Sequence, residues 1–114
     1  MSLSTTHGKG VIEIDDIDAD WVYGTDVTAN EGFPAGGMGV RSIAFVPSQA
    51  NDRMIIHDGG VDAAVFFDTG AMTTVDPAVQ YFERNEPWRR PVIDESDCTI
   101  GGSSANSKVI ITYY

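Results

Sequence analysis

The sequence has one cysteine and lacks any long hydrophobic run. A single cysteine, Cys98, cannot form an internal disulfide, which fits folding in a reducing compartment. No apolar stretch approaches the ~20 residues of a membrane-spanning helix, so no membrane partner is expected. The first ten residues, MSLSTTHGKG, are polar and lack the apolar segment of a signal peptide. We therefore expect a soluble protein that is not exported by that route.

Basic residues are also scarce. Seven Lys and Arg residues against 17 Asp and Glu residues give a formal net charge of −10 and an isoelectric point near 4.2. A chain of this charge repels the phosphate backbone, so no nucleic-acid partner is expected. The same acidity suits high solubility, docking onto a basic protein surface, or a salty medium that screens charge.

The sequence offers few residues of the kinds that carry catalysis. A nucleophile, a base and an orienting acid must come together for nucleophilic catalysis. The candidates are Cys98, with His7 or His57 as the base and Asp58 or Asp97 as the acid. The first histidine lies in the polar N-terminus, and the second closes a strand before a turn, where a surface histidine is expected. One cysteine and two separated histidines also fall short of a zinc site. We expect neither an enzyme nor a cofactor.

An acidic run at residues 15–20 imitates the opening of a calcium-binding loop through Asp16, Asp18 and Asp20. The rest of that pattern is missing, because Trp21 stands where glycine is required and Val27 where a bidentate glutamate is required. A solvated acidic turn is the favoured interpretation. A looser divalent-cation site remains the alternative.

What the sequence does have is a series of short apolar runs separated by turn residues. Residues 41–69 contain three of them, RSIAFVPS, RMIIHDGG and AAVFFDTG, whose alternating, β-branched and aromatic residues are typical of strands. Proline, glycine, asparagine and aspartate lie between them and favour chain reversal. We expect a three-strand antiparallel meander here. Similar runs occur at residues 11–14, 21–25, 80–84, 91–94 and 108–114.

These runs predict an all-β fold, namely an antiparallel β-sandwich or partly open barrel of about seven to nine short strands. Residues 11–114 are expected to form a single domain, which is long enough for one hydrophobic core. The alternation predicts a set of largely buried side chains. They are Ile43, Phe45, Ile55, Phe66, Ile93, Val109 and Ile111.

Two segments show no strand pattern. Residues 1–10 are polar and contain glycine, which predicts a mobile N-terminal arm. Residues 26–39 contain four of the 12 glycines and one proline, and they predict a long glycine-rich loop on the surface. Loops of this length in a small domain are commonly binding elements.

Neither the arm nor this loop has a strand pattern that would order it within its own domain. We therefore expect both segments to lie at subunit contacts. Phe33 and Met38 are the best apolar anchors in the loop. Arg84, Arg89 and Arg90 beside Trp88 form the one basic, aromatic cluster, which suits binding of an anionic group, and Trp88, Arg89 and Arg90 are further candidates for partner contact. The alternative for the arginines is internal balancing of nearby carboxylates.

Over about residues 40–114 the chain resembles small β-rich virion structural proteins of tailed bacteriophages, in the five stretches RSIAFVPS, NDRMIIHDG, PVID, CTI and VII. The resemblance implies a non-enzymatic capsid decoration or cement subunit that stabilises the head through protein–protein contacts. A neck or tail subunit is the alternative. It also implies self-association, with a trimer as one form, contact with the major capsid or other virion proteins, and residence in the virion after assembly in the host cytoplasm.

The residues themselves leave a function of a different class open. A small β-sandwich can bind carbohydrate by stacking aromatic rings on the sugar, and Trp21, Tyr23 or Trp88 would supply the rings. Tryptophans in a small β domain more commonly belong to the core.

Overall fold

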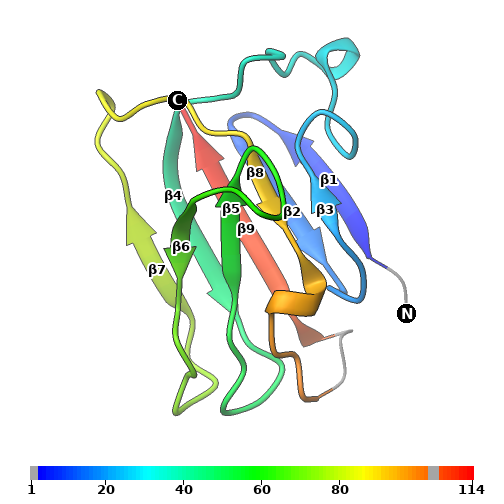
Figure 1. Ribbon diagram of the computed structural model, residues 1–114, viewed down its shortest axis with the longest axis vertical. Coiled ribbons are helices and arrows are strands. Elements are labelled where there is room, and N and C mark those ends of the chain that lie inside the picture. The colour runs from blue at the N-terminus through cyan, green and yellow to red at the C-terminus, as the bar shows by residue number, and fades with distance from the viewer. Residues whose placement is uncertain (1–2, 103–105) are drawn as a thin grey trace.

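Two antiparallel β-sheets pack face to face in the computed structural model, which describes residues 3–102 and 106–114 (Figure 1). The strands are β1 (Ser4–Gly8), β2 (Val11–Asp15), β3 (Trp21–Val22), β4 (Val40–Val46), β5 (Ile55–Asp58), β6 (Val65–Asp68), β7 (Ala78–Tyr81), β8 (Pro91–Ile93) and β9 (Lys108–Tyr113). Two short 3₁₀ turns, η1 (Ala29–Glu31) and η2 (Glu95–Asp97), lie in the connections. The predicted all-β class is confirmed.

The strand order is β1-β2-β9-β4-β7 in one sheet and β3-β8-β5-β6 in the other. Strand β2 pairs with β9, β3 with β8, β4 with β7, and β5 with β6. The chain is therefore one long antiparallel hairpin, closed at β5 and β6, that is rolled so that successive segments alternate between the sheets. This is the strand order of a jelly roll. Strand β1 extends the larger sheet beyond β2.

The core consists of side chains that point inward from the two sheets. Alternate residues of β2, β4 and β9 face the core, and residues of β3, β5, β6 and β8 meet them from the opposite sheet. The fully buried residues on these strands are Ile12, Ile14, Ile43, Phe45, Val109 and Ile111 in the larger sheet, and Trp21, Ile56 and Ile93 in the smaller. Phe67 is nearly as well buried.

Five of the seven predicted core residues are confirmed, and two are wrong. Ile55 and Phe66 are only partly buried, whereas their neighbours Ile56 and Phe67 face the core. Two adjacent isoleucines give no alternation from which to choose a face. In β6 the register shifts, because Ile56 lies opposite Phe67 and His57 lies opposite Val65, so Phe66 is the extra residue of a bulge.

The predicted three-strand meander is wrong for its first two strands, because β4 and β5 belong to different sheets. Strand β4 lies between β7 and β9 in the larger sheet, and the chain then crosses to the smaller sheet before β5 begins. Strands β5 and β6 do form the expected antiparallel pair. The crossing segment is held by Asp52, a buried residue whose carboxylate accepts hydrogen bonds from the backbone N–H groups of Ser48, Gln49 and Gly101. Turn residues alone do not distinguish a hairpin from a crossing between sheets.

The N-terminal residues predicted to form a mobile arm are instead paired in the larger sheet where the structure describes them. Ser4–Gly8 form β1 and pair with β2 at five positions. The indole N–H of Trp21 donates to the Thr5 hydroxyl at 3.0 Å, which ties this strand to the smaller sheet. The sequence is polar because β1 is an edge strand and is mostly exposed. Residues 1–2 of the expected arm lie outside the described residues.

Replacing Phe45 by alanine tests this core. Its ring is fully buried, so the variant should lose about 3–5 kcal/mol of unfolding free energy. Urea unfolding monitored by circular dichroism measures the loss. The exposed Val61→Ala variant is the control and should change stability by less than about 0.5 kcal/mol. A loss for Phe45→Ala below about 1 kcal/mol would show that the ring is not part of the core.

Candidate protein-binding surface

The connections between strands gather at two ends of the sandwich, because successive strands run in opposite directions (Figure 1). The upper end in that figure carries residues 9–10, 23–39 and 82–90 together with Tyr114, and the connection at residues 59–64 starts at this end and folds back over the smaller sheet. The lower end carries residues 16–20, 47–54, 69–77 and 94–107.

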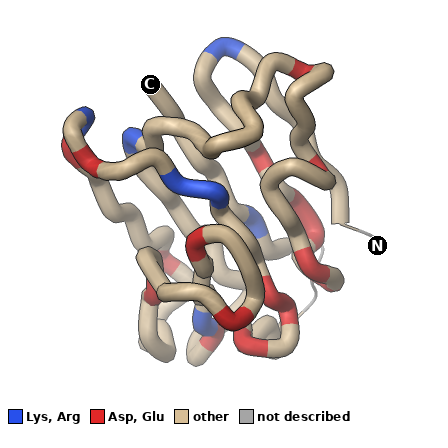
Figure 2. The backbone as a smooth tube through the Cα atoms, turned by 45° about the horizontal axis from the view of Figure 1, so that its top comes forward, with Lys and Arg blue, Asp and Glu red and all other residues tan. Residues whose placement is uncertain are grey.

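Charge is divided very unevenly between the two ends. Figure 2 shows red acidic segments concentrated in the lower connections, whereas blue and red segments mix at the upper end. The charged residues of the lower connections are Asp16, Asp18, Asp20, Asp52, Asp76, Asp94, Glu95 and Asp97, with Arg53 as the single base. Those of the upper connections are Asp26, Glu31, Asp62, Glu83 and Glu86, with Lys9, Arg84, Arg89 and Arg90. The upper end is therefore nearly neutral, and the lower end carries most of the net charge.

Two distant segments meet at the upper end. The backbone N–H of Met38 donates to the Arg89 carbonyl at 2.9 Å, and the N–H of Arg89 donates to the Met38 carbonyl at 2.9 Å. Gly37 permits this approach: its φ is +112°, and a Cβ atom there would lie 2.7 Å from the Arg89 carbonyl oxygen. The structure thus brings the glycine-rich loop beside the predicted basic, aromatic cluster.

The two predicted apolar anchors of this loop are buried within the chain itself. Phe33 and Met38 are 4% and 3% exposed, so the expectation that they contact a partner is corrected. The Phe33 ring lies 5.2 Å from the ring of His7, 6.2 Å from Tyr23 and 5.6 Å from Tyr113. The loop folds its apolar side chains inward because the upper end of the sandwich would otherwise leave the core open to water.

Arg89 balances charge inside the molecule. Its Nη1 lies 3.1 Å from an Asp58 carboxylate oxygen, and its Nη2 lies 3.8 Å from Glu86. The guanidinium carbon also lies 5.2 Å from the centre of the Phe66 ring. The alternative of internal charge balancing therefore describes this residue, and its side chain is less than a quarter exposed.

Arg90 is placed differently. Its backbone N–H donates to Asp58 at 3.0 Å, but its guanidinium lies 6.0 Å from the Tyr23 ring and forms no ion pair with any carboxylate in the described ranges. Burial raises the pKa of the Tyr23 hydroxyl, and the charge of Arg90 opposes that shift. Arg90 therefore leaves a positive charge at the upper end that no described side chain neutralises.

Trp88 and Tyr114 are the exposed aromatic residues of this end, at 59% and 46%. They flank Gly39: a Cβ atom there would lie 3.8 Å from the Trp88 indole nitrogen and 3.5 Å from the Tyr114 ring. The Tyr114 hydroxyl donates to the Phe82 carbonyl at 3.0 Å, so its ring is held in place. We call Trp88, Arg90 and Tyr114 the Trp88 surface.

His57 is not the surface histidine that the sequence predicts. It is only 6% exposed, and it lies under the connection between β5 and β6, which crosses the outer face of the smaller sheet (Figure 1). Its Nδ1 lies 2.8 Å from the Ala63 carbonyl oxygen and its Nε2 lies 2.9 Å from an Asp97 carboxylate oxygen. Both partners are acceptors, so only the doubly protonated imidazolium satisfies both. The hydrogen bond to Ala63, aided by Asp97, raises the pKa of His57.

Of the candidate catalytic groups, His57 and Asp97 meet, but the Cys98 thiol forms no hydrogen bond to His57 in the described ranges. Cys98 packs against Met54, with the sulfur atoms 3.6 Å apart, and burial raises the pKa of its thiol to about 11. Both ring nitrogens of His57 already bind other groups, so neither is free to accept the thiol proton. His7 lies at the opposite end of the sandwich, where its Nε2 is 2.7 Å from Glu31, and Asp58 binds the two arginines.

The acidic run at residues 15–20 caps backbone groups. Asp18 accepts a hydrogen bond from the Leu3 N–H at 2.8 Å, and Asp20 accepts one from the Glu95 N–H at 2.9 Å. Within residues 3–102 and 106–114, no group of three or more His, Cys, Asp or Glu residues is arranged to hold a metal ion. No helix in the same ranges is long and apolar enough to cross a membrane.

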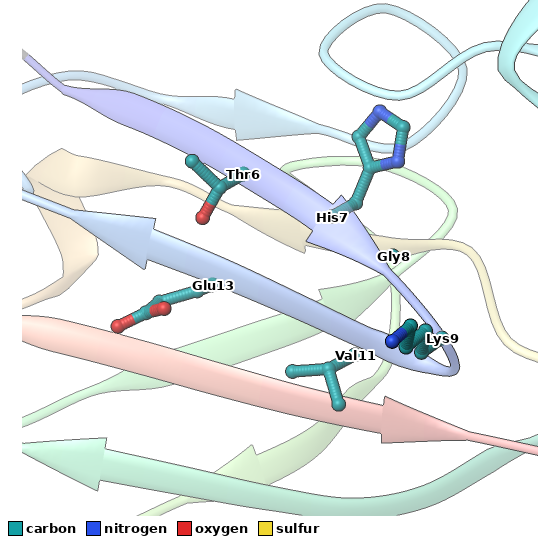
Figure 3. A pocket seen from close by; sticks show the side chains of 6 residues that line it. All are labelled: Thr6, His7, Gly8, Lys9, Val11 and Glu13. Carbon is teal, nitrogen blue, oxygen red and sulfur yellow. The ribbon is translucent and has the colours of Figure 1, made fainter.

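A hollow of about 300 Å³ lies beside the hairpin of β1 and β2 (Figure 3). Thr6, Val11 and Glu13 line it from the outer face of the sheet, and His7 points the other way. Glu13 is already paired with the Lys108 ammonium. The hollow therefore lacks the convergent free polar groups that orient a small ligand.

Sequence reasoning identified the Trp88 and Arg90 part of this surface and missed Tyr114. Tyr114 follows the apolar run of β9, so the sequence pattern predicted only a strand position for it.

Comparison with protein-family models, with curated proteins and with solved structures finds no match. The jelly-roll assignment therefore depends on the strand order alone.

The His57 contacts predict how stability depends on pH. Below the ordinary pKa of 6.5 the ring is protonated in both folded and unfolded chains, and its stabilising contribution is fully present. That contribution is lost as the pH rises through the raised pKa of the folded state. The difference in melting temperature between the wild type and His57→Gln should therefore shrink as the pH rises from about 6 to about 9. A difference that stays constant or grows over this interval would contradict the assignment.

Proposed function

We propose that the protein is a non-enzymatic virion structural protein, a capsid decoration or cement subunit that attaches through the Trp88 surface. The observation that carries this proposal is the exposed Trp88, which lies near Tyr114 and two residues before the unneutralised Arg90, on the nearly neutral end of an otherwise strongly acidic protein.

The chemistry of the two ends favours attachment by the upper one. Tryptophan, tyrosine and arginine are the residues that most often dominate binding energy at protein interfaces. Burying the lower end would strip water from many carboxylates, which is costly unless each finds a partner. The acidic end therefore faces solvent in the assembled particle, where its charge keeps neighbouring particles apart.

The fold and the sequence resemblance both support a virion role. Jelly rolls are common in viral capsid domains, but they also occur in lectins and cupins, so the fold alone does not decide function. A subunit of the neck or tail would use the same kind of surface. The number of copies in each particle distinguishes these positions, because decoration subunits cover a shell whereas neck and tail subunits form a few rings.

Carbohydrate binding is the weaker alternative. Of the three aromatic residues that the sequence offers for stacking on a sugar, Trp21 is fully buried and Tyr23 is 1% exposed. Trp88 alone remains accessible. Its neighbours, an arginine and a tyrosine held by a backbone carbonyl, fit a protein partner at least as well.

Particles purified from the virus that encodes the chain provide the test. Mass spectrometry should find the protein in many copies, and recombinant wild type should rebind to particles from which it has been stripped. Trp88→Ala should weaken rebinding by about tenfold or more, because its ring is a central contact. Val61→Ala is the matched control, since Val61 is also an exposed apolar residue but lies in the connection that crosses the smaller sheet, and it should rebind like the wild type.

Two results would overturn the proposal. One is the absence of the protein from purified particles. The other is retention of Trp88→Ala on the particles with wild-type affinity. Binding of the wild type to an immobilised glycan array, with loss of that binding in Trp88→Ala, would instead support the carbohydrate alternative.

A further inference from the structure

Strand β7 forms one edge of the larger sheet and has little covering it (Figure 1). Among the described strands it pairs with β4 alone. Val79 is 51% exposed and Tyr81 is 78% exposed, and they lie on the same face of the strand. Val65 on the neighbouring edge strand β6 is 47% exposed. Apolar surface is therefore concentrated along this side of the sandwich.

The hydrogen-bonding groups of β7 that remain free belong to the same two exposed residues. The Phe82 N–H donates to the Arg41 carbonyl at 2.9 Å, so the even-numbered residues of this strand direct their backbone groups toward β4. The N–H and C=O groups of Val79 and Tyr81 consequently point away from the sheet. This edge presents both apolar side chains and a template for another strand.

Natural edge strands are usually protected by charged side chains, proline or bulges. Strand β7 reads Ala-Val-Gln-Tyr and has none of these within its bounds. Strand β1, at the opposite edge of the sheet, contains His7, whose Nε2 lies 2.7 Å from a Glu31 carboxylate oxygen. The unprotected edge of β7 is therefore suited to pairing with another chain.

We propose that two copies of this chain pair through β7 in antiparallel fashion about a two-fold axis. Residues that lie opposite each other must point to the same face of the joined sheet. Centring the pair on Gln80 meets this condition and places Val79 of each copy opposite Tyr81 of the other. Each such pair exchanges both N–H···O=C bonds, because these residues carry the outward groups.

Charge complementarity supports a second copy as the occupant of this edge. The same register brings Asp76 of each copy toward Arg84 of the other. Neither residue forms an ion pair within the part of the chain that the structure describes. The Arg84 guanidinium lies 5.0 Å from the centre of the Tyr114 ring. A two-fold pair thus gains two ion pairs at its ends and apolar contacts at its centre.

This pairing is independent of the proposed virion role, since it depends on β7 and not on Trp88. Sedimentation of the full chain measures it directly. With rising concentration, the mass should move from the 12.3 kDa of the single chain toward about twice that value. Dimerisation of this kind requires no other component.

Two variants test the contact. Val79→Pro removes an outward N–H without breaking a bond to β4, and it should weaken dimerisation by about tenfold. Asp76→Arg places like charges together and should weaken it similarly, whereas the double variant Asp76→Arg with Arg84→Asp should restore it. Asp62→Arg makes the same charge change in the connection between β5 and β6 and is the matched control.

Three outcomes would overturn the proposal: a chain that stays monomeric at every concentration, a trimer in place of a dimer, or a Val79→Pro variant that folds and dimerises like the wild type. Should Val79→Pro fail to fold, the charge reversal decides, because a double variant that dimerises no better than Asp76→Arg would exclude the register. A monomeric Val79→Pro variant that still rebinds to virus particles would separate this proposal from the proposed function.

Discussion

The pairing of β2 with β9 is the constraint on which the rest of the molecule depends. It joins residues from near the two ends of the chain, and it places Ile12 opposite Ile111 and Ile14 opposite Val109 at the centre of the core. This pairing closes the intervening chain into one large loop, which continues as a rolled hairpin that alternates between the two sheets. Contacts so distant in sequence close large loops, so their entropic cost must be met by burial of these apolar side chains.

The rolled hairpin also determines where charge and binding groups lie. Because connections alternate between the two ends, acidic turns that are scattered through the sequence gather at the lower end. The segments that meet at the upper end contain most of the arginines and the exposed Trp88. The long connections are fixed to the sandwich by specific bonds, such as the backbone bridge of Met38 with Arg89 and the two hydrogen bonds of His57. The result is a rigid body with two chemically different ends.

Much of the fold was predictable because the strands that form the centre of the sandwich carry clear alternation. The runs VIEI and KVIITY identify both the strands and their buried faces. Which sheet each strand joins was not predictable, since turn residues look alike in hairpins and in crossings. The burial of Phe33 and Met38 was not predicted, because the glycine-rich segment has no hydrophobic periodicity that would indicate a buried face. Large apolar side chains are nevertheless usually buried in folded domains. The role of His57 depends on Ala63 and Asp97, and the second of these is distant in sequence.

The proposal that this acidic jelly roll attaches to a virion through its upper end is tested most directly by a cryo-electron microscopy map of the virus particle. The account predicts density for the sandwich on the particle, with the connection between β7 and β8 against the neighbouring virion protein and the lower end in solvent. Trp88 should be buried in that contact. A map in which the lower end touches the particle while Trp88 faces solvent would contradict the account.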